Sequence, residues 1–254
     1  DVCRSLVGSE MCIRDRLYSS MSHWLAWLPG GLMHANIGAS MVFAATSGSS
    51  VATAATIGTV ATPVIKTYGY GERLFLGTVA AGGTLGILIP PSINLIIYGW
   101  LTQTSVPQLY LAGFVPGIVL GLIFMATILI CCLIRPEWRG RAIETSWKER
   151  VASLNGLVPP GIIFLIVIGS IYAGFATPTE SAALGVVVAI GLAAINRRLS
   201  IRMILEALDG TMRTSAMIML IVASAFFLNF VLSAIGLVGA LNSFITGLGL
   251  GPMG

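Results

Sequence analysis

Charged side chains are scarce in this sequence: 9% of its 254 residues are Asp, Glu, Lys or Arg, whereas 56% are hydrophobic. A soluble domain carries about 25% charged residues, so this chain has too few to cover the surface of one. The net charge of +4 is not gathered into a basic cluster with interleaved aromatic residues, which argues against a nucleic-acid-binding face. The composition favours an integral membrane protein.

Residues that serve as metal ligands or catalytic bases are scarce as well. His23 and His34 are the only histidines, and Cys131 and Cys132 are adjacent inside an apolar run, where packing roles are expected. Neither a disulfide framework nor a metal-ligand spacing is present. A serine hydrolase using residues 47–50 would need a nearby His base and an acidic partner for it, and no Asp or Glu lies nearby. We therefore predict that the protein is not an enzyme and has no organic cofactor, and that His34 is a packing or interfacial residue.

Long apolar runs are abundant. Crossing a bilayer takes about 20 apolar residues, and residues 114–134, 157–176 and 216–235 meet this length. A fourth run, 181–195, becomes long enough if its helix begins at Thr177. The letters TPTE at 177–180 support that start, because Thr is a good N-cap, Pro fits the first helical position, and Glu three residues on completes a capping box.

The segment between residues 17 and 104 is apolar but interrupted. The breaks are LPGG at 28–31, TSGSS at 46–50, AGGTLG at 81–86 and IPPS at 89–92. Proline removes a backbone donor, and glycine loosens a helix. We predict a helical hairpin over residues 30–66, followed by a broken helix over 72–103. Such irregular backbone survives at membrane depth only inside protein or beside a water-filled cavity.

The basic residues beyond residue 16 predict an orientation. If the hairpin enters and leaves on one side and each later run crosses once, all eleven lie on the same side, which the positive-inside rule makes cytoplasmic. Loops at 104–113 and around 177 then face the other side, and segments 135–156 and 196–213 become interfacial connectors. The eleven residues are Lys66, Arg73, Arg135, Arg139, Arg141, Lys148, Arg150, Arg197, Arg198, Arg202 and Arg213.

The two central breaks offer chemistry for an ion and an acid. Helix C-terminal ends expose carbonyl groups and N-terminal ends expose N–H groups, each end equivalent to about half a charge. Carbonyl oxygens with nearby hydroxyls suit Na⁺, whereas the N–H groups at 50–52 and 92–94 suit a carboxylate. For Thr53, Thr56 and Gly58, close helix packing is the favoured interpretation. The hydroxyls predicted to hold Na⁺ are those of Ser47, Ser49, Ser50 and Thr84.

These stretches also resemble a known family. FAATSGSSVATAATIGTVATPVIKTYGYGERL (43–74) and AAGGTLGILIPPSINLIIYG (80–99) are similar to the large membrane subunit of tripartite ATP-independent periplasmic (TRAP) transporters, as are GFATPTESAALG and ASAFFLNFVL further on. The resemblance implies an all-α, elevator-type transporter of the bacterial inner membrane that imports small organic acids, such as C4-dicarboxylates or sialic acid, with sodium. It also implies two partners, a periplasmic substrate-binding protein and a small four-helix membrane subunit.

The resemblance further implies the site residues. By position, the first hairpin tip comprises Ser47, Gly48, Ser49 and Ser50, and the unwound segment comprises Gly83, Thr84, Gly86, Pro90, Pro91 and Ser92. Thr177 and Glu180 are further possible site residues, although the capping box explains Glu180 equally well.

The sequence departs from that family in two places. Residues 1–16, DVCRSLVGSEMCIRDR, hold six of the 24 charges and resemble a translated sequencing adaptor, so we expect a non-native or disordered tail there. The family also has a second hairpin and a second Pro-Pro break, and no copy of either occurs in 181–254. We therefore expect an incomplete inverted repeat: a transport-domain half over 17–113, spans with connectors over 114–213, and the start of a second repeat over 214–254.

Two functional alternatives stay open at this point. An ion channel can also use breaks lined with carbonyl groups, and a structural membrane subunit would use the small residues for packing alone.

Overall fold

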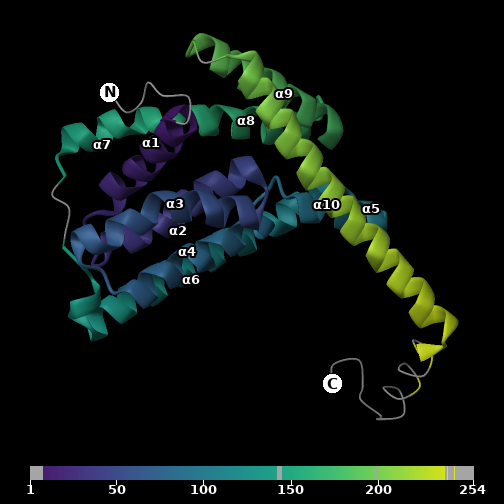
Figure 1. Cartoon of the computed structure of the whole chain (residues 1–254), viewed down its shortest axis with the longest axis horizontal. Coiled ribbons are helices and arrows are strands. Elements are labelled where there is room, and N and C mark those ends of the chain that lie inside the picture. The colour runs from purple at the N-terminus through teal and green to yellow at the C-terminus, as the bar shows by residue number, and fades with distance from the viewer. Residues whose placement is uncertain (1–7, 142–144, 198, 238, 240–242, 244–254) are drawn as a thin grey trace. The chain divides into compact units, whose positions relative to one another are not determined.

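The chain folds into helices, as predicted. The computed structural model describes residues 8–141, 145–197, 199–237, 239 and 243, with side chains from Leu17 onwards. It divides into unit 1, Asp1–Asn196, and unit 2, Arg197–Gly254. Unit 1 holds the following helices (Figure 1): α1 Gly8–Leu25, α2 Gly31–Ser47, α3 Ser50–Tyr68, α4 Glu72–Leu88, α5 Ile93–Thr102, α6 Val106–Ile134, η2 Pro136–Trp138, α7 Trp147–Ser153, η3 Leu154–Gly156, α8 Val158–Tyr172 and α9 Pro178–Ile195.

The predicted hairpin is formed by α2 and α3. Gly48 ends α2 in the left-handed region at φ +60°, where glycine carries no steric penalty, and its N–H bonds the Ala44 carbonyl. Ser49 then caps α3, since its Oγ accepts from the Ala52 N–H at 3.3 Å. One residue of αL backbone and one serine cap thus reverse the chain.

The predicted broken helix is formed by α4 and α5. The Ile89 N–H makes the last bond of α4, to the Leu85 carbonyl at 2.9 Å. Pro90 and Pro91 follow without donors, and Ser92 precedes the first residue of α5. The interruption lies at residues 89–92, where the sequence predicts the Pro-Pro break. The prediction that the helix is already broken at 81–86 is wrong: Gly83, Thr84 and Gly86 belong to α4, which stays helical to Leu88, because glycine loosens a helix without removing a backbone donor.

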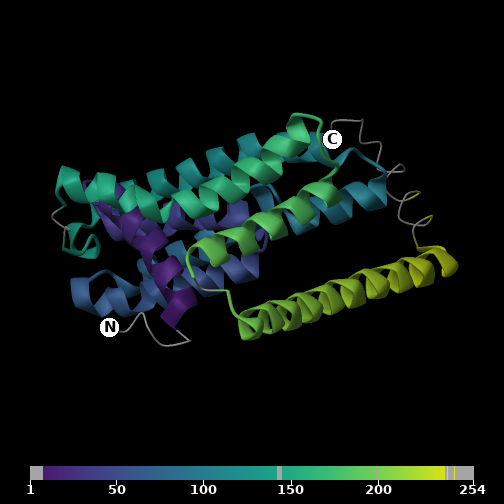
Figure 2. The ribbon, with the colours of Figure 1, turned by 90° about the horizontal axis from the view of Figure 1, so that it is seen from above.

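Helix α6 packs closely against the break and against α2. A Cβ added to Gly113 would lie 2.9 Å from the Leu88 carbonyl oxygen, and one added to Gly117 would lie 2.9 Å from the Ile89 side chain. Gly121, one turn further, touches Met41 of α2 in the same way. The seam of three glycines lets α6 run beside α4 (Figures 1 and 2). Irregular backbone at 89–92 is therefore covered by protein, as predicted.

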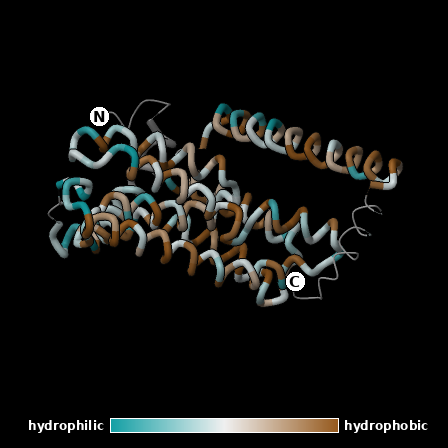
Figure 3. Tube along the Cα trace, turned by 90° about the horizontal axis from the view of Figure 1, so that it is seen from below, coloured by the Kyte–Doolittle hydropathy of each residue, from teal (hydrophilic) through white to brown (hydrophobic). Residues whose placement is uncertain are grey.

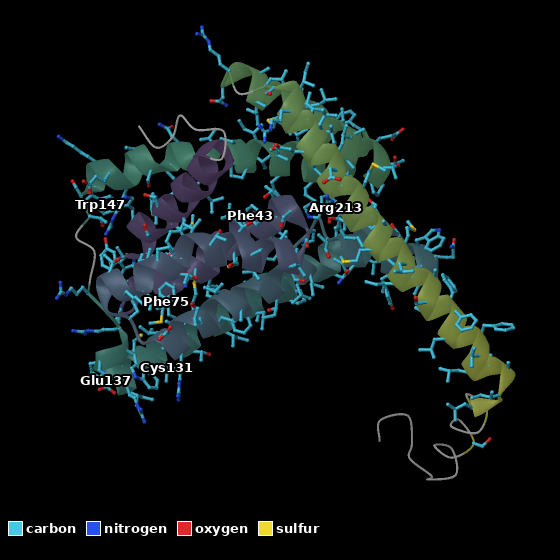
Figure 4. All side chains as sticks on the ribbon, in the orientation of Figure 1. Phe43, Phe75, Cys131, Glu137, Trp147 and Arg213 are labelled. Atoms are coloured by element: carbon cyan, nitrogen blue, oxygen red, sulfur yellow. The ribbon has the colours of Figure 1, made fainter. Side chains whose placement is uncertain are left out.

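Basic residues of unit 1 gather at one end. The turn after α3 pairs with the segment after α6, since the Gly71 N–H bonds the Trp138 carbonyl at 3.3 Å and the Arg141 N–H bonds the Tyr68 carbonyl at 2.9 Å. Trp147, Cys131 and Glu137 lie at this end in Figure 4, and Figure 3 shows hydrophilic residues concentrated there. This arrangement agrees with the one-sided distribution expected for the seven residues of unit 1, from Lys66 to Arg150; for the four basic residues of unit 2 the distribution stays a prediction.

The membrane-length helices differ in extent from the predicted runs. Within the described residues, four segments are long and apolar enough to span: Glu72–Thr102, Val106–Ile134, Pro178–Ile195 and Ile201–Ala234. Helix α6 already begins at Val106, so most of the predicted 104–113 loop is helical. Helix α8 ends at Tyr172, earlier than predicted, and reaches spanning length only together with residues 147–156, at a bend of 49°.

Two further predictions concern the chain's charged segments. Residues 8–16 form the first half of α1, whereas the sequence predicted a non-native or disordered tail over residues 1–16; residues 1–7 lie outside the described residues. That residues 1–16 are non-native stays a prediction. In unit 2, α10 (Ile201–Ala234) is one helix of 34 residues, so residues 201–213 are its first turns rather than a separate connector. The ion pairs Arg202–Glu206 and Arg213–Asp209, both 2.8 Å, join residues four apart and stabilise those polar turns.

A buried polar chain joins α1, α2 and α4. The Tyr18 hydroxyl donates to Asn36 Oδ1 at 2.9 Å, and Asn36 Nδ2 donates to Thr78 Oγ1 at 2.8 Å. Asn36 is fully buried, so its amide cannot exchange these bonds for water. The chain of hydrogen bonds fixes the first arm of the hairpin against the helix that carries the break.

We expect Asn36→Ala to lower the free energy of unfolding by about 2 kcal/mol, because the buried Tyr18 hydroxyl loses its acceptor and Thr78 Oγ1, which still donates to the Phe75 carbonyl, loses a donor. Thermal unfolding of the purified protein measures this. Asn155→Ala, at an exposed asparagine of η3, is the matched control and should change stability by less than about 0.5 kcal/mol. Equal effects of the two variants would contradict the role given to the polar chain.

Candidate functional site

The structure brings the hairpin tip and the break of α4–α5 into contact. The Gly48 carbonyl accepts from the Ile93 N–H at 3.4 Å, and a Cβ on Gly48 would lie 2.5 Å from the Pro91 carbonyl oxygen. A Cβ on Gly86 would lie 2.7 Å from the Ser49 carbonyl oxygen. We call this contact, formed by residues 47–50 and 86–93, the hairpin–break junction.

Two helix N-terminal ends meet at the junction, those of α3 and α5. Within the part of the chain that the structure describes, four amides of these first turns have no hydrogen-bond acceptor: those of Ser50, Val51, Asn94 and Leu95. The Ala52 and Ile93 amides are occupied by the Ser49 cap and the Gly48 carbonyl. Free amides at helix N-terminal ends favour an anion, and these four belong to the two N-terminal ends at which the sequence predicts a carboxylate site.

Oxygen atoms from the C-terminal end of α2 and from the first turn of α3 also lie at the junction. Ser47 Oγ lies 3.1 Å from Thr53 Oγ1, and Thr53 in turn donates to the Ser49 carbonyl at 2.7 Å. Thr53 is fully buried. The sequence interpretation gave Thr53 a packing role; its position four residues after Ser49, on the first turn of α3, is the signal that places its hydroxyl against the tip.

Ser92 contributes a hydroxyl that has no protein partner. Its side chain is fully buried at the start of α5, and within the described residues Oγ makes no hydrogen bond, not even the N-terminal cap that serine usually provides. A buried hydroxyl without a partner costs about 1–3 kcal/mol. Such a group at a helix N-terminal end is suited to a bound ion or acid.

Thr84 lies apart from the other predicted sodium ligands. Its side chain is exposed, and its hydroxyl donates to the Ala81 carbonyl at 2.7 Å on its own helix. Gly83 and Gly86 instead face α3, since a Cβ on Gly83 would lie 2.7 Å from Ala54 Cβ. The two glycines therefore serve close packing of α4 on the hairpin, while Thr84 points to a surface that the described residues do not cover.

The outer face of α3 carries a shallow groove of about 580 Å³. The hydroxyls of Thr59 and Thr62 donate to carbonyls within α3, so the face offers close packing more than binding. This agrees with the packing role predicted for Gly58. The groove is lined by Ala54, Ala55, Gly58, Thr59, Thr62, Pro63 and Lys66.

Thr177 and Glu180 form the predicted capping box at the start of α9. The Glu180 carboxylate accepts from the Thr177 N–H and from its hydroxyl, both at 2.8 Å. Because Gln supplies the same acceptor, we expect Glu180→Gln to leave the thermal stability unchanged within experimental error. Thr177→Ala removes the cap and should cost about 1 kcal/mol. Lost transport in a stable Glu180→Gln variant would make the charge of the carboxylate part of the site.

Metal and hydrolytic chemistry find little support in the described residues, where no three His, Cys, Asp or Glu side chains gather. The ring of His34 is buried, with Nδ1 3.2 Å from the Gly30 carbonyl and Nε2 3.1 Å from the Met125 carbonyl. It joins α2 to α6 and agrees with the predicted packing role.

Comparison with known proteins identifies relatives across most of the chain. Residues 7–254 match the family model described as tripartite ATP-independent periplasmic transporter, DctM component. The chain is 36% identical over 241 residues to the C4-dicarboxylate TRAP transporter large permease protein DctM of Pseudomonas aeruginosa, covering 94% of this chain and 56% of the relative. It thus spans about half the length of that protein.

Two further relatives carry other substrate names. The isethionate TRAP transporter permease protein DctMQ of Oleidesulfovibrio alaskensis is 34% identical, over 83% of this chain and 33% of its own. The sialic acid TRAP transporter permease protein SiaT of Haemophilus influenzae is 34% identical, over 67% of this chain and 27% of its own. All three relatives are named as transporter permeases, not as enzymes.

Proposed function

This chain belongs to the DctM family of tripartite ATP-independent periplasmic transporters, and we propose that it forms part of the large permease of a sodium-coupled importer of small organic acids. It is a multi-pass membrane protein, and we place it in the bacterial inner membrane. Its proposed partners are a periplasmic substrate-binding protein, which delivers the acid, and a small four-helix membrane subunit. The names of the relatives support a carboxylate or similar anion as substrate.

The observation that carries this proposal is the hairpin–break junction. There Gly48 accepts from the Ile93 N–H, and the fully buried Ser92 hydroxyl lacks a protein partner. Two helix N-terminal ends and two C-terminal ends meet within a few residues. An anion is therefore stabilised by the partial positive charge of the N-terminal ends, and a cation by the partial negative charge of the C-terminal ends. Discontinuous helices serve the same purpose in secondary transporters generally.

In the proposed site, Na⁺ takes carbonyl oxygens of the junction and the hydroxyls of Ser47, Ser49 and Ser50. The acid takes the free amides at the start of α3 and α5, with the Ser92 hydroxyl between them. Each ligand lowers the electrostatic cost of the other, since their charges are opposite and the site is removed from water. Coupling follows, because the acid binds weakly to a junction that lacks sodium. Thr84 joins the site in this proposal only if a further segment covers the exposed face of α4.

Uptake of a radiolabelled acid into proteoliposomes tests the proposal, with the complete permease, its small subunit and its binding protein present. We expect uptake to require both an inward sodium gradient and the binding protein. Sodium current without the binding protein would favour a channel. A structural subunit would be favoured if Ser47→Ala, Ser49→Ala and Ser50→Ala lower assembly of the complex but leave uptake intact.

A further inference from the structure

An exposed apolar stripe runs along α7 and continues onto α8. It comprises Trp147, Val151, Leu154, Val158, Ile162 and Leu165, spaced three or four residues apart as one helical face requires. Trp147 is 72% and Val151 62% exposed, so no described residue covers them. Residues 147–156 and 158–172 reach membrane length only together and are bent by 49° at the break between them, so the part of the stripe on α7 runs at an angle to the part on α8.

The opposite face of α7 is fixed to α1. The Trp24 indole N–H donates to the Arg150 carbonyl at 3.2 Å, and the Ser20 hydroxyl donates to the Ser153 carbonyl at 2.6 Å. These two bonds hold the second half of α7 to α1. They fix the orientation of α7 in unit 1, with Trp147 and Val151 exposed.

Cations flank the stripe. Lys148 is exposed, and the Arg150 guanidinium lies 5.1 Å from the centroid of the Trp147 ring. A second pair of this kind lies nearby in sequence, with Arg135 4.7 Å from the Trp138 ring. The one carboxylate on α7, Glu149, is engaged with the Ser146 N–H at 2.9 Å. Within the described residues neither Lys148 nor Arg150 makes an ion pair.

We propose that α7 is a docking surface for anionic phospholipids, with Trp147 and Val151 inserted at the level of the headgroups and Lys148 and Arg150 contacting their phosphates. The stripe continues onto the exposed apolar face of α8, which belongs to a segment of membrane length, and this argues for a lipid occupant rather than a soluble one. Arg150 donates from Nε to Thr145 Oγ1 at 3.3 Å, which leaves its other guanidinium nitrogens for a phosphate. Cations beside a tryptophan argue for an anionic headgroup, because tryptophan prefers the interface and each cation near an anionic surface adds affinity. The site holds α1, and through it the hairpin, at a set depth.

Quenching of tryptophan fluorescence by brominated lipids tests this inference. The complete permease is placed in nanodiscs with equal mole fractions of brominated phosphatidylglycerol or brominated phosphatidylcholine, and the Trp147 signal is obtained by subtracting Trp147→Phe. We expect preferential quenching by phosphatidylglycerol. In the double variant Lys148→Gln/Arg150→Gln, the preference for phosphatidylglycerol over phosphatidylcholine should fall by about fivefold for each cation removed. Uptake by this variant is measured separately.

The matched control is Arg202→Gln/Arg213→Gln, which removes the same charge from two arginines already paired with carboxylates. It should keep the wild-type preference. Equal quenching by the two lipids would overturn the inference. So would the absence of quenching by either lipid, which would mean that protein, such as the small subunit, covers the stripe. The measurement requires no transport, so its failure leaves the proposed function untouched.

Discussion

Gly86→Ala should abolish sodium-driven uptake, reducing it at least a hundredfold, although the change adds only one methyl group. The new Cβ would lie 2.7 Å from the Ser49 carbonyl oxygen and 2.9 Å from the Ser50 nitrogen. Both are backbone atoms of the hairpin tip, so no side-chain rotation can relieve the overlap. The tip must move away from α4, and the carbonyls and amides of the junction lose the mutual geometry on which binding depends.

The same substitution at Gly77 is the control, because both glycines lie in α4 and nothing lies within 4 Å of a Cβ at Gly77. Gly77→Ala should keep uptake and stabilise the helix by up to about 1 kcal/mol. Uptake rates and thermal unfolding of the two variants are compared in proteoliposomes prepared in the same way. If Gly86→Ala transports as well as Gly77→Ala, the junction is not the binding site.

The sequence was sufficient to predict the elements that meet at this junction. Glycine and serine at 48–49 and two prolines at 90–91 act on the backbone locally, so their effects are independent of distant contacts. The outer ends of the hairpin and of the broken helix were therefore predicted within two residues. The end of α4 was not, because the glycines at 82–86 were taken as a break and the helix continues through them to Leu88. The capping box at Thr177 is local too, and the structure confirms it.

Other features depend on packing and were missed for that reason. Asn36 is an ordinary polar residue in the sequence, and only the approach of α1 and α4 turns it into the centre of a buried hydrogen-bond chain. Thr53 was assigned to packing because helical spacing alone does not show which face meets the tip. Thr84 was grouped with the serines because it lies beside the second predicted break, yet it sits within α4 and its side chain is exposed.

Glycine has two distinct functions in this architecture. At Gly48 it allows a left-handed turn, whereas at Gly86 and Gly113 it allows backbone to approach backbone. The second function brings four helix ends into one small volume without side chains between them. The half-charges of those ends then act on a ligand directly, which explains how a site can be built with few charged residues.

Ser92→Ala should separate binding from stability. Within the described residues the Ser92 hydroxyl is buried without a partner, so its removal relieves a desolvation cost and should keep or raise thermal stability by about 1 kcal/mol. If the hydroxyl binds the ion or the acid, the same change removes a hydrogen bond to a charged group, worth about 1.5–3 kcal/mol. The sodium or acid concentration for half-maximal uptake should then rise roughly tenfold or more.

Ser40→Ala is the matched control for this prediction. Its hydroxyl is also fully buried and also lacks a partner among the described residues, but it lies against Gly82, about two turns before the hairpin tip. Its removal should leave both half-saturation concentrations unchanged and stability equal or slightly higher. A similar loss of affinity in both variants would point to a general effect of buried hydroxyls on the fold. Unchanged affinity in Ser92→Ala would remove that hydroxyl from the site, and the amides of α3 and α5 would then have to hold the acid without it.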